Sequence, residues 1–329
     1  MRNAVIKSIG AYAPENIIPN SYFNELLGED VDTWLRENLT IKERRWSSEN
    51  EATSDLSVEA SKLALERASL KPEDIDLIIV TTDTPDFISP STASVVQDKL
   101  KATNAGTFDI NTACAGFVTG IDVGSKYIRG DENYNNVLVI GAYAMSKYLD
   151  LRDKKTVTLF ADGAGAVVLS AVDNGERGFQ ISKLHSEGQY NGWMGIYGGG
   201  TKIPLTPEKV EQKDHLLKFV KKFPKAINPT TWTRMITEMT ETQNLKPRDI
   251  DHYFLTQINI NSIWETMDNL GVDREKAHTI MDRYAYTGSA CIPMALNDAF
   301  EKGKIKEGDK IVFMGSGGGL AFASSIFIW

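Results

Sequence analysis

The chain repeats itself at about half its length, and this repeat constrains the fold more than any other feature. Residues 70–76 read LKPEDID and residues 245–251 read LKPRDID, an offset of 175 residues (70 to 245). A small-residue turn with a cysteine follows each copy, at Cys114 and Cys291, with an offset of 177 residues (114 to 291). Matched features at a nearly constant offset indicate two similar halves, with a functional site where corresponding loops meet.

Each copy of the repeat lies between a predicted helix and a predicted strand. Apolar residues recur at helical spacing before the two copies, at Leu56, Ala60, Leu63 and Ala64, and at Trp232, Met235, Ile236 and Met239. The Lys-Pro pair of each copy is expected to break its helix, and the apolar runs at 77–82 and 252–257 are typical of buried strands. Further strands are expected at 137–140 and 311–314. Helices that alternate with strands predict parallel or mixed sheets covered by helices.

The repeat divides the chain into two predicted domains. Residues 1–172 carry Cys114, and residues 173–329 carry Thr256, Tyr286 and a glycine loop. Residues 188–229 mix glycine, proline and lysine and have no clear counterpart in the first half. We expect this segment to form a cap or a substrate-access loop.

Charge and composition exclude several classes of function. The net charge of −8 argues against a nucleic-acid partner, which would require a basic patch. A local basic rim for a phosphorylated ligand stays open, at residues 154–155 and 221–222. Two cysteines in 329 residues form neither a disulfide framework nor a metal site, so a reducing cytoplasm is expected. We expect no signal peptide and no membrane partner, because no apolar run approaches the roughly 20 residues that cross a bilayer.

Cys114 is the strongest candidate for a nucleophile. It follows a short strand-like stretch at 108–110 and precedes a helix-like stretch, so it lies on a tight strand-to-helix turn. The partial positive charge of the helix start favours a thiolate there, and Ala113, Ala115 and Gly116 leave room for a substrate carbonyl. The competing interpretation is a buried cysteine that serves as a small apolar filler.

Two further features bear on catalysis. The glycine loop at 315–319 (GSGGG) follows a predicted strand, and its backbone N–H groups can hold an oxyanion; alternatively, it is a turn that needs positive φ angles. A cysteine nucleophile usually needs a nearby base. None of the four histidines lies in a small-residue context, so structural roles are expected for His185, His215, His252 and His278.

Several motifs resemble the β-ketoacyl-acyl-carrier-protein synthase III family. They are residues 41–45 (IKERR), 112–117 (TACAGF), 160–167 (FADGAGAV), 288–293 (GSACIP) and 308–319 (GDKIVFMGSGGG). The resemblance covers nearly the whole chain, in order. It implies an α/β, thiolase-like fold in which two pseudo-twofold-related α/β halves form a layered α-β-α-β-α core. It also implies a homodimer.

The resemblance further implies a reaction and its residues. An acyl-CoA passes its acyl group to Cys114, and a malonyl-carrier thioester then loses CO₂ and attacks the acyl-enzyme. The oxyanion hole would use the N–H groups of Cys114 and Gly319. Trp34 matches a tryptophan that stacks on the CoA adenine, Lys154 stands where an arginine completes the stack, and Asn38 replaces an arginine that holds CoA phosphate. No cofactor is expected besides the CoA or acyl-carrier thioesters that serve as substrates.

Two departures from the family pattern concern the condensation step. The family's His-Gln-x-Asn segment is here Thr256-Gln-Ile-Asn259, and Tyr286 stands at the position of the family's asparagine. Removal of one oxyanion donor costs about 3 to 4 kcal/mol. Thr256 and Tyr286 can each donate a hydrogen bond, but neither is a base near neutral pH. We therefore expect acylation of Cys114 to survive and malonyl decarboxylation to be impaired.

Three functions remain open at this point. The first is an acyltransferase that moves the acyl group from Cys114 to a malonyl thioester or another acceptor, supplied by acyl-CoA or acyl carrier protein. The second is a non-catalytic partner subunit of a heterodimeric ketosynthase, and the third is an acyl-CoA-binding protein. Phe87 and Ile88, in a loop after a strand, line the acyl tunnel in one interpretation and pack at the dimer interface in the other.

Overall fold

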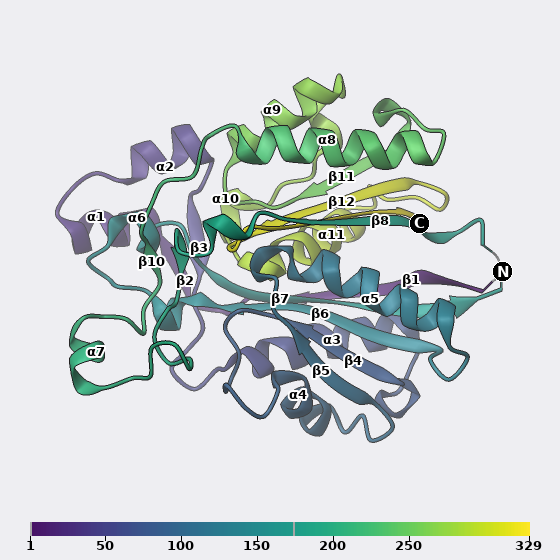
Figure 1. The fold of residues 1–329 in the computed structure, drawn as a ribbon, viewed down its shortest axis with the longest axis horizontal. Coiled ribbons are helices and arrows are strands. Elements are labelled where there is room, and N and C mark those ends of the chain that lie inside the picture. Colours follow the sequence, from purple (N-terminus) through teal and green to yellow (C-terminus); the bar gives the residue numbers. More distant parts are fainter. Residues whose placement is uncertain (1, 174) are drawn as a thin grey trace.

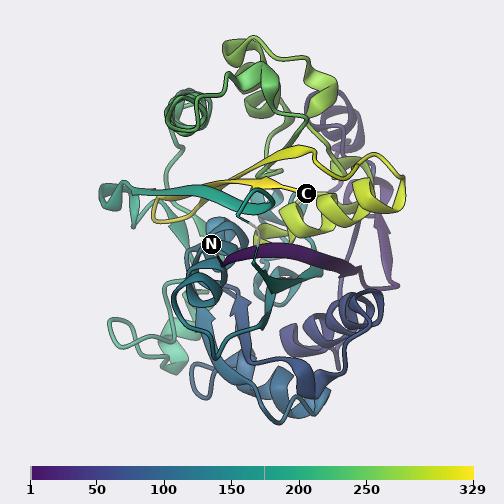
Figure 2. The same ribbon diagram turned by 90° about the vertical axis from the view of Figure 1, so that its right-hand side faces the viewer.

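The protein consists of two β-sheets with helices between them and on both outer faces. The computed structural model describes residues 2–173 and 175–329. Helices α5 (Gly116–Gly130) and α11 (Cys291–Glu301) lie between the two sheets (Figure 1). The outer face of one sheet is covered by α3 (Thr53–Ala68) and α4 (Thr92–Leu100), and that of the other by α8 (Ile227–Thr242) and α9 (Ile260–Leu270). This is the expected α-β-α-β-α order of layers, which Figure 2 shows edge-on.

Four strands of the first sheet match the four strands of the second. The first has the order β1-β7-β6-β4-β5 and the second β11-β12-β13-β8. In each, two parallel strands are followed by antiparallel ones, so that β4, β6, β7 and β1 correspond to β11, β12, β13 and β8. Only β5 lacks a full counterpart, because its equivalent is a single bridge between Tyr253 and Ala277. The strands are β1 (Asn3–Tyr12), β4 (Leu77–Thr81), β5 (Gly106–Ile110), β6 (Asn136–Ala144), β7 (Asp162–Val172), β8 (Gly178–Ser186), β11 (His252–Leu255), β12 (Lys310–Gly317) and β13 (Ala321–Ile328).

The division at residues 172 and 173 stays a prediction. In the structure, β7 ends at Val172 in the first sheet and β8 begins at Gly178 in the second. The cysteine turns, the strands and the helices of the two halves nevertheless pack into one another at the centre of the molecule.

The repeated heptapeptide makes the same contacts in each half: one hydrogen bond closes a turn, one isoleucine enters the core, and one hydrogen bond holds a neighbouring strand. In the first copy, the Asp74 carboxylate accepts a hydrogen bond of 2.8 Å from the N–H of Lys71, which closes a turn. Ile75 is fully buried, and the Asp76 carboxylate accepts a hydrogen bond of 2.8 Å from the N–H of Asn136 at the start of β6. The repeat therefore fixes where a strand enters its sheet. In the second copy, the Asp249 carboxylate accepts a hydrogen bond from the N–H of Lys246, and Ile250 is fully buried. The Asp251 carboxylate accepts one from the N–H of Lys310 at the start of β12.

The expectation that each Lys-Pro pair breaks its helix was wrong. Helix α3 ends at Ala68, and the next residue, Ser69, adopts a left-handed conformation with φ of 55°. Helix α8 likewise ends at Thr242, before the second Lys-Pro pair. Each proline instead begins a short 3₁₀ turn. The first residue of such a turn needs no N–H donor, and the fixed φ angle of proline suits this position.

The remaining elements surround one end of the molecule. A short hairpin forms from β2 (Ile17–Pro19) and β3 (Glu43–Arg45), while the segment 188–229 contains the pair β9 (Met194–Gly195) and β10 (Lys218–Phe219). This segment contacts the body of the protein where the Leu217 N–H donates to the carbonyl of Tyr148, at 2.8 Å. No helix in the described residues has the length and apolar character needed to cross a membrane. The other helices are α1 (Asn20–Leu27), α2 (Asp32–Leu39), α6 (Lys154–Val157), α7 (Pro207–Glu211) and α10 (Met281–Tyr284).

Gly141 lies where backbone of the two halves packs closely together. A Cβ atom added to it would lie 2.4 Å from the backbone oxygen of Ser289. We expect Gly141→Ala to lower the free energy of unfolding by about 1 to 3 kcal/mol, because backbone must move to relieve this contact. Gly130→Ala is the control, since a Cβ there meets open space; its stability should stay within about 1 kcal/mol of wild type. Urea unfolding measures both, and equal stabilities would contradict the prediction.

Candidate active site

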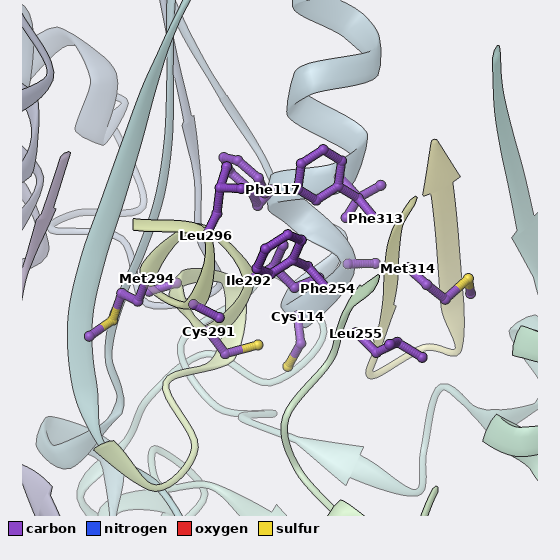
Figure 3. Close-up of a cluster of buried hydrophobic side chains, with 14 of the residues drawn as sticks. Cys114, Phe117, Phe254, Leu255, Cys291, Ile292, Met294, Leu296, Phe313 and Met314 are labelled. Carbon is purple, nitrogen blue, oxygen red and sulfur yellow. The ribbon is translucent and has the colours of Figure 1, made fainter. Parts of the chain in front are cut away.

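Cys114 lies on the predicted strand-to-helix turn. Strand β5 ends at Ile110, residues Ala113–Ala115 form a single 3₁₀ turn, and α5 begins at Gly116. The turn is tight enough to force Ala113 to a φ of 46°. A matching turn, Gly288–Ala290, precedes α11, whose first residue is Cys291. The two cysteines, both buried free thiols, thus meet at the starts of the two central helices (Figure 3).

The Cys114 thiol is held in its protonated form. Burial raises its pKa well above the ordinary value, and the negative charge of Asp83 raises it further. The Tyr286 hydroxyl opposes both effects by donating a hydrogen bond to the sulfur. The expectation that the helix start favours a thiolate is therefore not met, because burial outweighs the partial charge of the helix. Cys114 must lose its proton as it reacts.

Tyr286 is buried beside the nucleophile, and its role in catalysis stays a prediction. Its side chain is 1% exposed, and its ring lies 5.5 Å from that of Phe160 and 6.5 Å from that of Tyr143, centroid to centroid. Its backbone is held on both sides, by hydrogen bonds of 3.0 Å to the carbonyl of Leu159 and 2.9 Å from the N–H of Ala161. These contacts hold the Tyr286 side chain next to Cys114.

Thr256 is buried at the end of β11, and its hydroxyl is occupied by the neighbouring strand. It accepts a hydrogen bond of 2.9 Å from the N–H of Ser316 and donates one of 3.4 Å to the carbonyl of the same residue. Both bonds attach the end of β11 to Ser316, the second residue of the glycine loop. The structure therefore shows a structural use for the Thr256 hydroxyl, while its role as a donor to substrate stays a prediction.

The glycine loop packs directly against the backbone of Cys114. A Cβ atom added to Gly317 would lie 2.5 Å from the amide nitrogen of Cys114 and 2.6 Å from the carbonyl oxygen of Thr112. The sequence singled out Gly319, which adopts a φ of 138° two residues further on. Its role as an oxyanion donor stays a prediction, and Gly317 is the glycine that the structure brings against the nucleophile.

Asp83 and Tyr143 are site residues that sequence reasoning missed. Asp83 follows β4, and its buried Oδ1 has no hydrogen-bond partner among the described residues. Burial raises the pKa of its carboxyl to about 6. Burial, Asp83 and Cys114 together raise the pKa of Tyr143, so its hydroxyl stays protonated. Its position in the chain could have indicated Asp83. It lies two residues after the buried strand β4, and β4 is parallel to β5, the strand that leads to Cys114.

The residues expected to bind CoA lie at the surface, and three of them lie together. Trp34 is 54% exposed on α2. The Asn261 side chain donates to the carbonyl of Asn38 at 3.0 Å, and the Asn259 side chain accepts from the N–H of Asn261 at 3.0 Å, which links α2 to the start of α9. Lys154 pairs with Glu29 at 3.0 Å. Phe87 is 56% exposed in the loop after β4, apart from these residues in sequence. Their contacts with substrate stay predictions.

Three of the four histidines have carboxylate partners. His252 Nε2 lies 2.9 Å from an Asp309 oxygen, and His278 Nε2 lies 2.6 Å from an Asp298 oxygen. His185 Nε2 lies 3.7 Å from Glu187. These pairs give each of the three a partner other than Cys114, in keeping with the structural roles expected for them.

Known proteins resemble this chain over nearly its whole length. Residues 108–188 match the 3-oxoacyl-[acyl-carrier-protein] synthase III family, and residues 240–329 match the C-terminal region of the same family. The chain is 39% identical over 325 residues to a β-ketoacyl-[acyl-carrier-protein] synthase III of Aliarcobacter butzleri, covering 98% of this chain and 97% of the relative. It is 38% identical over 328 residues to the protein of that description from Clostridioides difficile, covering 99% and 98%.

Solved structures show the same fold. The 3-oxoacyl-[acyl-carrier-protein] synthase III of Aquifex aeolicus superimposes with a TM-score of 0.89 at 30% identity, covering 99% of this chain and 100% of that one. The more distant OleA of Xanthomonas campestris, at 21% identity and a TM-score of 0.83, shares the fold alone. These matches confirm the thiolase-like fold. The chain belongs to the 3-oxoacyl-[acyl-carrier-protein] synthase III family.

Proposed function

We propose that the chain is an acyltransferase of the 3-oxoacyl-[acyl-carrier-protein] synthase III type, and that it carries the acyl group as a thioester on Cys114. The observation that carries this proposal is the environment of the sulfur. Cys114 lies on a tight turn, Gly317 packs against its backbone, and the Tyr286 hydroxyl bonds its sulfur. A non-catalytic partner subunit would not need a buried nucleophile placed in this way.

The geometry supports a simple transacylation. The Cys114 sulfur attacks the carbonyl carbon of an acyl-CoA or acyl-carrier thioester, and negative charge develops on the carbonyl oxygen. Backbone N–H groups of Cys114 and of the glycine loop stabilise this oxyanion. The thiol of CoA or of the carrier then leaves, and the acyl group remains on Cys114. A malonyl thioester or another acceptor takes the acyl group in the second half of the reaction.

The family relationship and the surface residues support CoA as the acyl donor. Trp34→Ala should raise the KM for acyl-CoA by about 10-fold or more, because base stacking on an aromatic ring contributes about 1 to 3 kcal/mol. The maximal rate of acylation should change little, since Trp34 is remote in sequence from Cys114 and lies on the surface. Leu26→Ala, which removes another exposed apolar side chain, is the control. An unchanged KM in Trp34→Ala would contradict the assignment.

We further propose that the protein forms a homodimer and is located in the cytoplasm. Strand β5 is the edge of its sheet and pairs only with β4 within the described chain, so its outer edge can pair with a second copy. Ile88, which is 84% exposed in the nearby loop, also suits such an interface. Both cysteines are free thiols, which fits a reducing compartment. Light scattering on the purified chain distinguishes a homodimer from a monomer that awaits a different partner.

Intact mass spectrometry tests the function directly. We expect wild-type protein incubated with short-, medium- and long-chain acyl-CoA to gain the mass of one acyl group with at least one of them. Cys114→Ala should gain none, whereas Cys291→Ala should retain the adduct, because the glycine loop packs against the turn of Cys114. Malonyl-CoA added afterwards, with CO₂ release measured, separates condensation from other transfers. No adduct with any chain length would refute the proposal.

A further inference from the structure

The sheet topology brings Asp83 to the nucleophile. Strands β4, β5 and β6 are parallel, so their carboxyl ends meet at one edge of the first sheet. Asp83 lies two residues after β4, Cys114 follows β5, and Tyr143 lies near the end of β6. The N–H of Thr82 donates to the carbonyl of Ile110 at 3.1 Å, which holds the start of the Asp83 loop against the strand that leads to Cys114.

Asp83 is a partly buried residue, and one atom of its carboxyl is a buried, unused acceptor. Its Oδ1 is inaccessible to solvent and has no hydrogen-bond partner among residues 2–173 and 175–329. Burial is the dominant influence on its pKa, and a hydrogen bond from its own N–H acts in the opposite direction. Buried carboxylates are normally paired or hydrogen-bonded. The buried Oδ1 of Asp83 has no such partner in the described part of the chain, so this oxygen is free to accept a proton.

We propose that the Asp83 carboxylate accepts the proton of Cys114 as the sulfur attacks the acyl thioester, and returns that proton to the departing CoA sulfur. The proposal rests on the acyl-enzyme of the proposed function. One bond forms, between the Cys114 sulfur and the acyl carbon, and one breaks, between that carbon and the CoA sulfur. One proton passes from Cys114 through Asp83 to CoA. The step is therefore balanced without any further reactant.

Proton transfer to Asp83 must occur together with the attack of the Cys114 sulfur, because the thiol is the weaker acid of the two groups. The pKa of Cys114 lies well above that of Asp83, so the resting pair is a thiol and a carboxylate. The proton moves only as the sulfur forms its new bond and loses its affinity for hydrogen, which is general base catalysis. The two histidines on β11 and beside it cannot replace Asp83 without giving up their partners, since the Nε2 atoms of His252 and His278 bond Asp309 and Asp298.

Five groups around Asp83 stay neutral near pH 6, and the sixth, the Asp162 carboxyl near Tyr143, is already engaged by hydrogen bonds from Ser47 and Ser146. Facing it or its neighbours are Tyr143 from β6, Tyr148 from the turn after β6, Cys114 from the turn before α5, and Tyr286 and Cys291 from the second half. The pKa of each is raised above its ordinary value, so all five are neutral between pH 5 and 8. The Asp83 carboxyl, with a pKa of about 6, becomes a base as the pH rises through that value.

A pH profile of single-turnover acylation tests the proposal. Octanoyl-CoA is mixed with the full-length protein from about pH 4.5 to 8.5, and adduct formation is followed by quenching and intact mass. The wild-type rate should rise about tenfold per pH unit below pH 6 and level off above pH 7. Asp83→Asn, which keeps the shape but cannot take a proton, should be slower by about 100-fold or more and should lack this rise. Asp98→Asn, which removes a carboxylate that is 79% exposed on α4, should follow the wild-type profile.

Alkylation of Cys114 by iodoacetamide distinguishes a base from a mere negative charge. If Asp83 only repels the thiolate, Asp83→Asn will alkylate faster than wild type and will acylate at least as fast, and the proposal is overturned. If Asp83 is the base, acylation falls although Cys114 remains open to alkylation. The wild-type profile decides the matter even if the variant does not fold, since a rate that is flat below pH 8 overturns the proposal. Absence of any wild-type adduct refutes the acyl-enzyme itself, which is a separate outcome.

Discussion

Gly317→Ala should slow the acylation of Cys114 by about 100-fold or more. The added methyl group would meet the Cys114 nitrogen at 2.5 Å and the Thr112 oxygen at 2.6 Å. Both are backbone atoms of the turn that holds the nucleophile, so no side chain can swing aside to make room. The turn itself must move. A displacement of about 1 Å at a reacting group costs on the order of 100-fold in rate, and loss of one oxyanion donor costs about 100- to 1,000-fold.

Single-turnover acylation with octanoyl-CoA measures this effect, and urea unfolding shows that the variant remains folded. Gly200→Ala serves as the matched control, because a Cβ at that position meets nothing within 4 Å. Its acylation rate should equal that of wild type. If Gly317→Ala acylated Cys114 at the control rate, the glycine loop could not be packed against the turn as the structure shows.

Much of the fold could be predicted because the repeated heptapeptide acts locally. Asp74 and Asp249 each bond an N–H three residues earlier, and Ile75 and Ile250 each enter the core one residue later. Such contacts depend on residues that are close in the chain, so their pattern is visible in the sequence. The same holds for the turn at Cys114, which small residues and the strand-to-helix order indicate.

The chemistry of the site was harder to predict, because it depends on residues that only the fold brings together. The sequence favoured a Cys114 thiolate on the basis of the helix start, whereas burial and the charge of Asp83 decide its pKa. Asp83 is 31 residues away in sequence (83 to 114), and only its position after a buried strand hints that it is a site residue. Similarly, only the packing of β12 against the cysteine turn shows that Gly317 approaches Cys114, whereas the resemblance pointed to Gly319.

Tyr286→Phe should reduce the rate of Cys114 acylation by about 10- to 100-fold while it changes stability by only about 1 kcal/mol. The substitution keeps the ring, and with it the packing against Phe160 and Tyr143, but it removes the hydroxyl that bonds the Cys114 sulfur. That hydrogen bond is the one influence from another residue that lowers the pKa of Cys114, so its loss leaves the thiol harder to deprotonate. A hydrogen bond to a charged group contributes about 1.5 to 3 kcal/mol, which corresponds to the expected change in rate.

Thr256→Val, of nearly the same shape, should show the opposite pattern. It leaves the buried N–H of Ser316 without its 2.9 Å partner, so the free energy of unfolding should fall by about 1 to 3 kcal/mol. Its acylation rate should fall less than tenfold, because the Thr256 hydroxyl is engaged by the backbone of β12. Urea unfolding and single-turnover acylation on both variants separate the two hydroxyls. If Thr256→Val instead lost as much acylation as Tyr286→Phe at unchanged stability, Thr256 would be a donor to the reacting thioester, and its bonds to Ser316 would have to exchange for one to substrate.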